Sequence, residues 1–223
     1  MHPPCGRRGL RPIASRRPER RLDGAHRKQP GASGCLQAAQ SALRRKALTR
    51  LDRHCRRFVE LSPFVVVGTS GAAGQDVSPR GGPPGFVKLL DAETLLLPDF
   101  PGNNRLDSIE NILEDGRIGM LFLVPGMDET LRVNGRATLE ADPALRAQTA
   151  VDGRTPLSVL RVAVEQAYLH CGKALMRSAL WDPAAQIDRA TLPSMGEMLR
   201  DQLSLDKGET QDEMLLRYKQ TLY

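Results

Sequence analysis

The stretch RIGMLFLVPGMDETLRVNGRATLE, residues 117–140, decides the fold class of this chain. It opens with an apolar run, RIGMLFLV, of the kind found in buried strands. A turn follows at Pro125 to Asp128, and ETLRVNGRATLE then alternates polar and apolar residues, as a strand with one buried face does. Two strands joined by so short a turn run antiparallel, so we expect a hairpin here.

Further strands flank this hairpin. An apolar, β-branched run at Phe64 to Gly68 and a return strand at Asp76 to Ser78 enclose a glycine-rich turn. Two more strands are predicted at Phe86 to Leu90 and Glu93 to Asp99, and a last long one at Val159 to His170. Six or seven strands, linked mostly by hairpins, favour an antiparallel barrel over a doubly wound α/β sheet.

Helices are expected around these strands. Residues Leu36 to Glu60 carry an apolar stripe between basic residues, which indicates an amphipathic helix. A second helix is predicted from about Asn104 to Glu114, and a short one begins at Asp142-Pro143. Two helical segments follow in the last 30 residues, at about 194–203 and about 209–222. The predicted fold class is therefore mainly β with flanking helices.

The chain divides into three parts, with boundaries at 1–35, 36–183 and 184–223. The middle part is the barrel domain with its N-terminal helix. The last part is a helical extension that we expect to pack on the barrel, or on a dimer of two such chains. Residues 1–30 hold nine of the 32 Lys and Arg residues and two of the 26 Asp and Glu residues, which leaves 23 basic and 24 acidic residues elsewhere. The first part is rich in Arg, Pro and Gly without an apolar period, so we expect a disordered tail. A solvated tail or a misplaced start codon explains it better than a nucleic-acid-binding patch.

Common catalytic motifs are absent from the sequence, including a GxSxG elbow, a Walker loop and HExxH. The four histidines are isolated and the four cysteines form no CxxC pair, so no structural metal is expected. The cysteine usage fits a reduced, cytoplasmic protein, and no apolar run approaches the roughly 20 residues of a membrane span. An enzyme with so few acid, base or nucleophile groups would take its chemistry from a cofactor.

Two places in the sequence favour an anionic ligand. Ser78 and Arg80 end a strand just before glycines that allow close approach of a ligand to the backbone. Asn104 and Arg105 lie at the start of a helix, where amides and a guanidinium can bind the same phosphate.

Two further places are consistent with such a ligand. Glu129 and Thr130 open a strand beside a turn and could offer backbone groups to a planar ring. Lys173 and Arg177 are four residues apart on one helical face, and Trp181 follows one turn later.

Each of these residues also has a purely structural interpretation. Arg80 can cap a turn, Arg105 can pair with Asp107 or Asp99, and Lys173 and Arg177 can form a solvated face. Taken singly, the structural interpretation is the better one for each residue, and only their conjunction favours a ligand.

The motif order resembles the pyridoxamine 5'-phosphate oxidase-like family of FMN-binding flavoproteins, and within it the branch of FMN-dependent proteins of unassigned substrate. The resemblance covers about residues 36–223, and its most specific motifs are GNNRLDSIENIL and HCGKALMRSALW. It implies an FMN-binding split β-barrel that forms a homodimer, with one FMN in each of two clefts at the dimer interface. Residues of both subunits would line each cleft.

The resemblance also implies roles for individual residues. Arg80, with Ser78 nearby, and Asn104 with Arg105 match positions that hold the FMN phosphate in the family. The remaining matched positions would lie near the flavin ring or reach the flavin of the partner subunit: Pro98 in the strand Leu96 to Asp99, Glu129, Thr130, Lys173, Arg177 and Trp181.

The chain departs from the true oxidases at its C-terminus, which reads GETQDEMLLRYKQTLY and lacks their tryptophan- and arginine-bearing dimerisation segment. The basic tetrad that those oxidases use for a phosphorylated substrate is also not evident, so pyridoxamine phosphate is not the expected substrate. We expect an FMN-dependent oxidoreductase that acts on an unidentified small molecule, with NAD(P)H as a candidate reductant. The alternatives are a flavin- or haem-binding protein without turnover and a basic-tailed nucleic-acid-binding barrel, against which the aromatic content of 4% argues.

Overall fold

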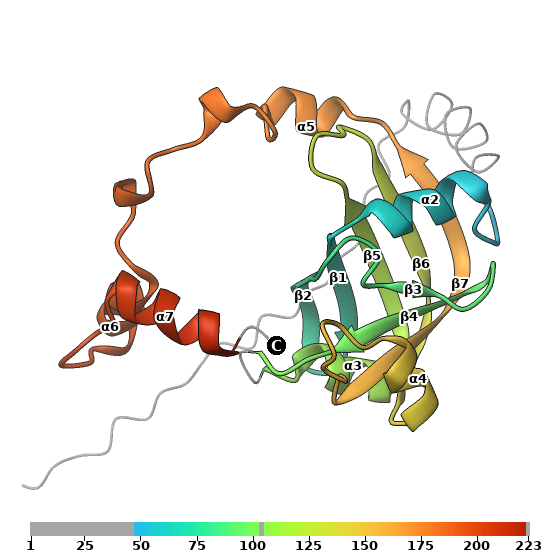
Figure 1. The fold of residues 1–223 in the computed structure, drawn as a ribbon, viewed down its shortest axis with the longest axis horizontal. Helices are drawn as coiled ribbons and strands as arrows, with labels where there is room; N and C mark the ends of the chain where they lie inside the picture. Colours follow the sequence, from blue (N-terminus) through green and yellow to red (C-terminus); the bar gives the residue numbers. More distant parts are fainter. Residues whose placement is uncertain (1–46, 103–104, 222–223) are drawn as a thin grey trace, which may run out of the picture. The chain divides into compact units, whose positions relative to one another are not determined.

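The described residues form a seven-stranded antiparallel sheet with the order β2-β1-β5-β6-β7-β4-β3 (Figure 1). The structure is a computed structural model that describes residues 47–102 and 105–221. Within those residues β2 and β3 pair on one side only, so the sheet remains open. The prediction of a mainly β, antiparallel fold with flanking helices is confirmed. The predicted tail at 1–35 and Asn104 lie outside the described residues.

The predicted strands are all present, with shifted ends. Their bounds are β1 (Phe64–Gly71), β2 (Gly74–Gly81), β3 (Lys88–Leu89), β4 (Thr94–Asp99), β5 (Arg117–Leu123), β6 (Thr130–Glu140) and β7 (Ser158–His170). The strand expected at Phe86 to Leu90 shrinks to two residues, because the Phe86 amide donates to the Pro83 carbonyl oxygen in a turn, at 2.9 Å, and not to a neighbouring strand. The hairpin expected at residues 117–140 is β5 and β6, with Arg117 opposite Arg136.

One face of the sheet carries the core, as the alternation of the strands predicts. Val65 and Val67 of β1 and Met120 and Phe122 of β5 are buried, whereas their neighbours in each strand face outward. The helix α2 (Arg53–Leu61) packs Cys55, Phe58 and Val59 into the same core, and Figure 1 shows it lying against the sheet. We call the face with the core the inner face and the opposite one the outer face.

The sheet curls strongly. Arg80 of β2 lies near enough to Asp99 of β4 for its positive charge to lower the pKa of that carboxyl. In a flat sheet these strands, five places apart in the strand order, would be separated by roughly 24 Å, which is beyond the reach of a screened charge. The inner faces of β2 and β4 therefore turn toward each other, as in a split barrel.

A β-bulge in the pair β6 and β7 contributes to this curvature. Asn134 is opposite Gln166 but Gly135 is opposite Val164, so Glu165 is an extra residue on β7. A Cβ on Gly135 would overlap the carbonyl oxygen of Ala163. Only glycine therefore allows the two backbones to approach so closely at the bulge.

Two of the predicted helices differ in the described residues. The amphipathic pattern from Leu36 implied one continuous helix to Glu60, yet α2 begins at Arg53 with Asp52 as its N-cap. Residue Leu48 instead forms a β-bridge with Ala167, an interaction that the helical spacing of apolar residues could not reveal. Residues 36–46 of the predicted helix lie outside the described residues.

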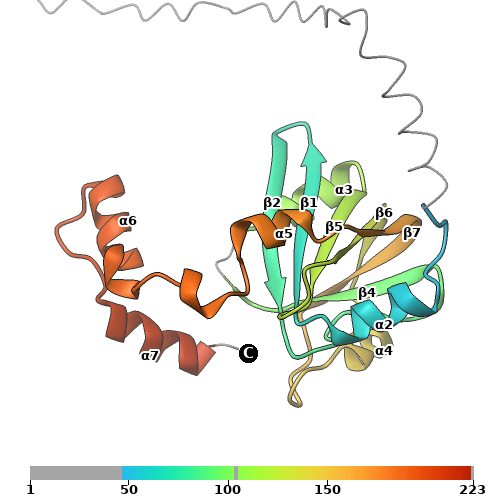
Figure 2. The same ribbon diagram turned by 90° about the horizontal axis from the view of Figure 1, so that it is seen from above.

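The helix α3 (Asp107–Glu114) begins three residues after Asn104, where the prediction had placed its start. It packs beside β1 and β2 (Figure 2), and buried Asn111 donates a hydrogen bond of 3.1 Å from Nδ2 to Oγ1 of Thr69 in β1. The predicted short helix after Asp142 is α4 (Pro143–Gln148), with Asp142 accepting from Ala144 N and Leu145 N.

The C-terminal part contains the predicted helices. Their bounds are α5 (Lys173–Ser178), η1 (Pro183–Ala185), η2 (Arg189–Thr191), α6 (Met195–Leu203) and α7 (Gln211–Thr221). Ser194 and Glu197 form a capping box at the start of α6. Gly196 and Gly208 let the backbones around α6 and α7 meet closely. Throughout residues 47–102 and 105–221, no helix has both the length and the hydropathy that a membrane span requires.

Candidate functional site

The open side of the curled sheet brings polar side chains of three strands together. We call this place the seam and define it by Ser78 and Arg80 of β2, Asp99 of β4 and Ser158 of β7. Arg80 donates from Nη1 to Oγ of Ser78 at 2.8 Å, and Ser158 donates from Oγ to Oδ2 of Asp99 at 3.3 Å. The seam is therefore made by residues that are up to 80 positions apart in the sequence.

Arg80 is the cation of the seam. Its side chain is half-buried, and within the described residues no carboxylate lies at ion-pair distance from it. The bond to Ser78 uses one of the five N–H donors that a guanidinium carries. The remaining donors are available to an acceptor that enters the seam.

Asp99 is the anion of the seam, at the end of β4. Burial raises the pKa of this carboxyl above its usual range, and the charge of Arg80 and the hydrogen bond from Ser158 offset part of that rise. The carboxyl is thus held near a cation without a close ion pair to stabilise its charged form.

The start of α3 is tied to the same strand. Ser108, in the first turn of α3, donates a short hydrogen bond from Oγ to Oδ2 of Asp76 in β2. Arg105 donates from Nε to Oδ2 of Asp107 at 2.8 Å, and it also acts electrostatically on Asp76. Both partners of that ion pair are exposed, so the structural interpretation of Arg105 as the partner of Asp107, rather than Asp99, is confirmed.

The remaining predicted site residues form a second group around the start of β6 and the segment that follows β7. Thr130 is buried and opposite His170, while Glu129 just before it is exposed. Lys173 and Arg177 are exposed on α5. Trp181 donates from Nε1 to the carbonyl oxygen of Met127 at 2.8 Å, which holds the segment after α5 against the turn before β6.

The ring-flanking candidate Pro98 belongs to neither group by direct contact. It is buried in β4 opposite Val159, one residue before Asp99. The structure thus brings Ser78 and Arg80 together, places Pro98 next to Asp99, and pairs Arg105 with Asp107. No printed hydrogen bond or ion pair of the described residues joins the second group to the seam.

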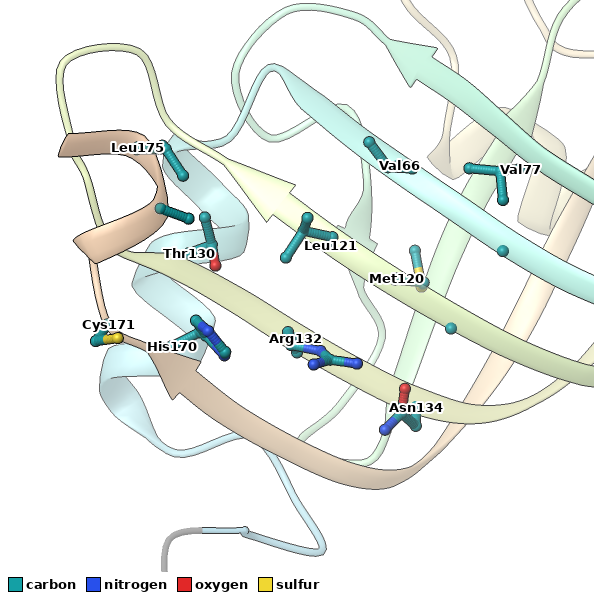
Figure 3. A pocket seen from close by; sticks show the side chains of 13 residues that line it. Val66, Val77, Met120, Leu121, Thr130, Arg132, Asn134, His170, Cys171 and Leu175 are labelled. Atoms are coloured by element: carbon teal, nitrogen blue, oxygen red, sulfur yellow. The ribbon is translucent and has the colours of Figure 1, made fainter. Parts of the chain in front are cut away.

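A pocket of about 380 Å³ lies on the outer face of the sheet (Figure 3). Its floor is apolar, with Val66, Val77 and Leu121, and Gly68 and Gly119 leave the backbone accessible. Thr130 is the one predicted site residue that lines it. The polar lining residues that the sequence interpretation missed are Arg132, Asn134 and His170. The alternation in ETLRVNGR, which puts residues 130, 132 and 134 on one face, was the signal for the first two.

The sequence model of the pyridoxamine 5'-phosphate oxidase family matches residues 51–171, which is more than half of the chain. The chain belongs to this family. The matched range begins just before α2 and ends after β7, so it contains the whole sheet and the seam.

Solved structures with low sequence identity resemble parts of the chain. HupZ of Group A Streptococcus is 18% identical over 53% of this chain and 93% of its own, with a TM-score of 0.43. A Clostridium acetobutylicum protein related to general stress protein 26 is 17% identical over 52% and 85%, with a TM-score of 0.42. An FMN-binding protein of Syntrophomonas wolfei is 11% identical over 62% and 98%, with a TM-score of 0.40. No curated protein matches this chain.

Proposed function

We propose that the protein binds FMN with the phosphate in the seam and uses it as an oxidoreductase on a small molecule. The observation that carries this proposal is the half-buried guanidinium of Arg80, which has no carboxylate at ion-pair distance among the described residues. A buried or half-buried cation without a close counter-ion is costly, and a phosphate would supply the missing charge.

The residues of the seam fit a phosphate. Arg80 offers donors in a planar fork, and Ser78 beside it offers a hydroxyl. The N-cap residue of α3, Leu106, provides no side-chain cap, so among the described residues no N-cap side chain competes with an anion for the first amides of this helix. Arg105 could exchange its exposed bond to Asp107 for a bond to the phosphate.

Two carboxylates near the seam oppose an anion, and both are already engaged. Asp76 accepts from Ser108, and Asp99 accepts from Ser158. The proposal therefore needs the two cations and the helix amides to outweigh these carboxylates. Pro98, next to Asp99, remains the candidate that flanks the flavin ring.

When bound, FMN would supply hydride or electron exchange. The protein's own residues would bind the phosphate, orient the ring and limit the access of water. We propose NAD(P)H as a reductant, and a small molecule other than pyridoxamine phosphate as the substrate. The described cysteines, Cys55 and Cys171, are free thiols, in keeping with action in the cytoplasm.

We also propose a homodimer in which the second group of one subunit reaches the seam of its partner. Lys173 and Arg177 are exposed and take part in none of the ion pairs of the described residues, so they are available to an anion on another chain. The outer face exposes Val77 by 71%, which is apolar surface that a second copy could cover.

Purification tests the proposal. A yellow protein with a flavin absorption spectrum and the mass of a dimer would support it, and a colourless protein whose melting temperature FMN does not raise would contradict it. Bleaching of the bound flavin by NAD(P)H, followed by the return of colour in air, would distinguish an oxidoreductase from a flavin-binding protein without turnover.

A further inference from the structure

Two glycines lie side by side on the outer face of the sheet, and packing does not require either of them. Gly68 of β1 is opposite Gly119 of β5, and neither has a positive φ. A Cβ on Gly68 would have the Gly119 carbonyl oxygen as its nearest neighbour, at 3.8 Å, and a Cβ on Gly119 would have Oδ1 of Asn134, at 3.4 Å. Glycine inside a strand weakens the fold, so this pair has a cost in stability. What the pair provides is a hollow in the outer face.

The register of four strands defines the size of this hollow. One row across β2, β1, β5 and β6 consists of Val77, Gly68, Gly119 and Asn134. Neighbouring strands are about 4.8 Å apart, so the residues at the two ends of the row are separated by roughly 14 Å. The pocket of about 380 Å³ includes all four residues (Figure 3), and we call it the outer pocket. Bare backbone between two side chains favours a flat ligand of about two rings.

Arg132 supplies the charge of the outer pocket. It lies two residues before Asn134 on β6 and therefore on the same face of the sheet. Its guanidinium carbon is 5.4 Å from the centroid of the Tyr168 ring, which is directly opposite on β7 and favours this position of the cation. Arg132 takes part in no ion pair of the described residues, and no acidic residue is among those that line the pocket. The pocket therefore offers a cation to an incoming anion.

The apolar part of the pocket complements this charge. Val66 of β1 and Leu121 of β5 are opposite each other in the next row of the sheet, and Leu121 is in turn opposite Arg132. Leu175 of α5 lines the pocket as well. The apolar surface adjoins the guanidinium directly, which suits a ligand that has apolar rings and one negative group.

A second copy of the chain is the alternative occupant, since Val77 at the edge of the pocket is exposed. In a two-fold contact centred on the pocket, the same patch of both chains would meet. Arg132 would then face the Arg132 of the other copy, and no acidic lining residue would separate the two charges. Repulsion between like charges thus favours a small anion as the occupant.

We propose that the outer pocket binds a flat, mostly apolar organic anion, with its rings over Gly68 and Gly119 and its negative group on Arg132. The outer pocket is separate from the seam within one chain, because Val77 and Ser78 are consecutive in β2 and face opposite sides of the sheet. The inference therefore goes beyond the proposed function and does not depend on FMN binding in the seam.

Isothermal titration calorimetry with 2-naphthoate tests this proposal, because the molecule is a flat pair of rings with one carboxylate. Its amide, 2-naphthamide, has nearly the same shape without the charge. Wild-type protein is expected to bind the carboxylate about tenfold more tightly than the amide. Arg132→Gln should weaken binding of the carboxylate by about tenfold and leave binding of the amide unchanged. Arg161→Gln removes an exposed charge of β7 outside the pocket and should bind both compounds as the wild type does.

Gly68→Val tests the hollow separately from the charge. Valine suits a strand, and a Cβ has room at this position, so the variant should fold with a melting temperature near that of the wild type. Its side chain would occupy the hollow, so it should bind neither 2-naphthoate nor 2-naphthamide. If Gly68→Val does not fold, Gly68→Ala places a smaller side chain at the same point and should weaken the binding of both compounds.

Four results would overturn the proposal. Wild-type protein that binds 2-naphthoate no more tightly than the amide, or not at all at millimolar concentration, would exclude the anion. Wild-type affinity in a folded Gly68→Val would show that the compound binds elsewhere. A folded Gly68→Val that loses self-association in size-exclusion chromatography would identify a second copy as the occupant. Displacement of 2-naphthoate by FMN would make the outer pocket a flavin site.

Discussion

Arg80 of β2 and Asp99 of β4 interact across the open side of the sheet, although the two strands are five places apart in the strand order. The interaction requires the sheet to curl until its first strand faces its sixth. It also places a half-buried guanidinium and a half-buried carboxyl in one site without an ion pair between them. The curl of the sheet therefore also forms the candidate phosphate site.

Arg105→Ala is expected to weaken FMN binding far more than it weakens folding. The exposed bond between Arg105 and Asp107 contributes little to stability because water competes with it, whereas a bond to a phosphate is charge-assisted. We expect the FMN dissociation constant to rise by about tenfold or more, with the melting temperature of the flavin-free protein unchanged. Arg161→Ala, on the outward side of β7, is the matched control. Unchanged FMN affinity in Arg105→Ala would remove Arg105 from the site.

Gly135→Ala should destabilise the fold. The new Cβ would overlap the Ala163 carbonyl oxygen at the bulge, so the backbones of β6 and β7 would have to separate. We expect the free energy of unfolding, measured by urea denaturation, to fall by about 1 to 3 kcal/mol. In Gly68→Ala the new Cβ would meet only the Gly119 carbonyl oxygen, at 3.8 Å, so this control should unfold at nearly the wild-type urea concentration. Equal stability of the two variants would show that the bulge has room for a Cβ at residue 135.

The thiol of Cys55 should resist alkylation. Burial, and to a lesser degree its interaction with Asp52, raises the pKa of Cys55 to about 11, so almost no thiolate exists near neutral pH. Mass spectrometry after iodoacetamide treatment should find Cys171, which is exposed, modified well before Cys55. Fast modification of Cys55 in the folded protein would contradict its place in the core.

The raised pKa of Cys55 also predicts a loss of stability at alkaline pH. Below about pH 8.5, the usual pKa of a thiol, Cys55 is neutral in the folded and in the unfolded state and does not affect the free energy of unfolding. Above that pH the unfolded chain ionises first, so stability falls until the folded thiol also ionises near pH 11. Cys55→Ala should lack this part of the alkaline slope in urea denaturation.

Mixed dimers can test whether Lys173 and Arg177 serve the partner's seam. We expect Arg80→Ala and the double variant Lys173→Ala, Arg177→Ala each to bind FMN weakly in pure form. A mixed dimer contains one chain of each variant. One of its seams would be affected by both sets of substitutions and the other by neither, so one tight FMN site should return. If the second group instead binds the FMN of its own chain, each seam is affected by one set of substitutions and no tight FMN site returns.

The strands were predictable because their signals are local. Alternation in residues 130–140, the glycines near the β1–β2 turn and the turn at Pro125 each specify structure within a few residues. The start of α2 was not predictable in this way, because Leu48 leaves the helical pattern to pair with Ala167, which lies 119 positions further along the chain.

The candidate site was predictable only where one strand supplies it. Ser78 and Arg80 alternate on β2 and were found from the sequence, and they are bonded as that spacing suggests. The nearness of Asp99 and Ser158 depends on the curl of the sheet, which no local pattern encodes. The sequence interpretation considered Asp99 as a partner for Arg105 and as the end of the strand that would flank the flavin ring, and the structure pairs Arg105 with Asp107.

Equilibrium binding of FMN to wild-type protein and to Arg80→Ala tests the central claim most directly. The account predicts one FMN per chain for the wild type. It predicts a loss of about 1.5 to 3 kcal/mol of binding free energy in Arg80→Ala, a rise of roughly 10- to 150-fold in the dissociation constant. Riboflavin, without the phosphate, should bind both proteins equally. An FMN affinity that Arg80→Ala leaves unchanged would contradict the assignment of the seam as the phosphate site.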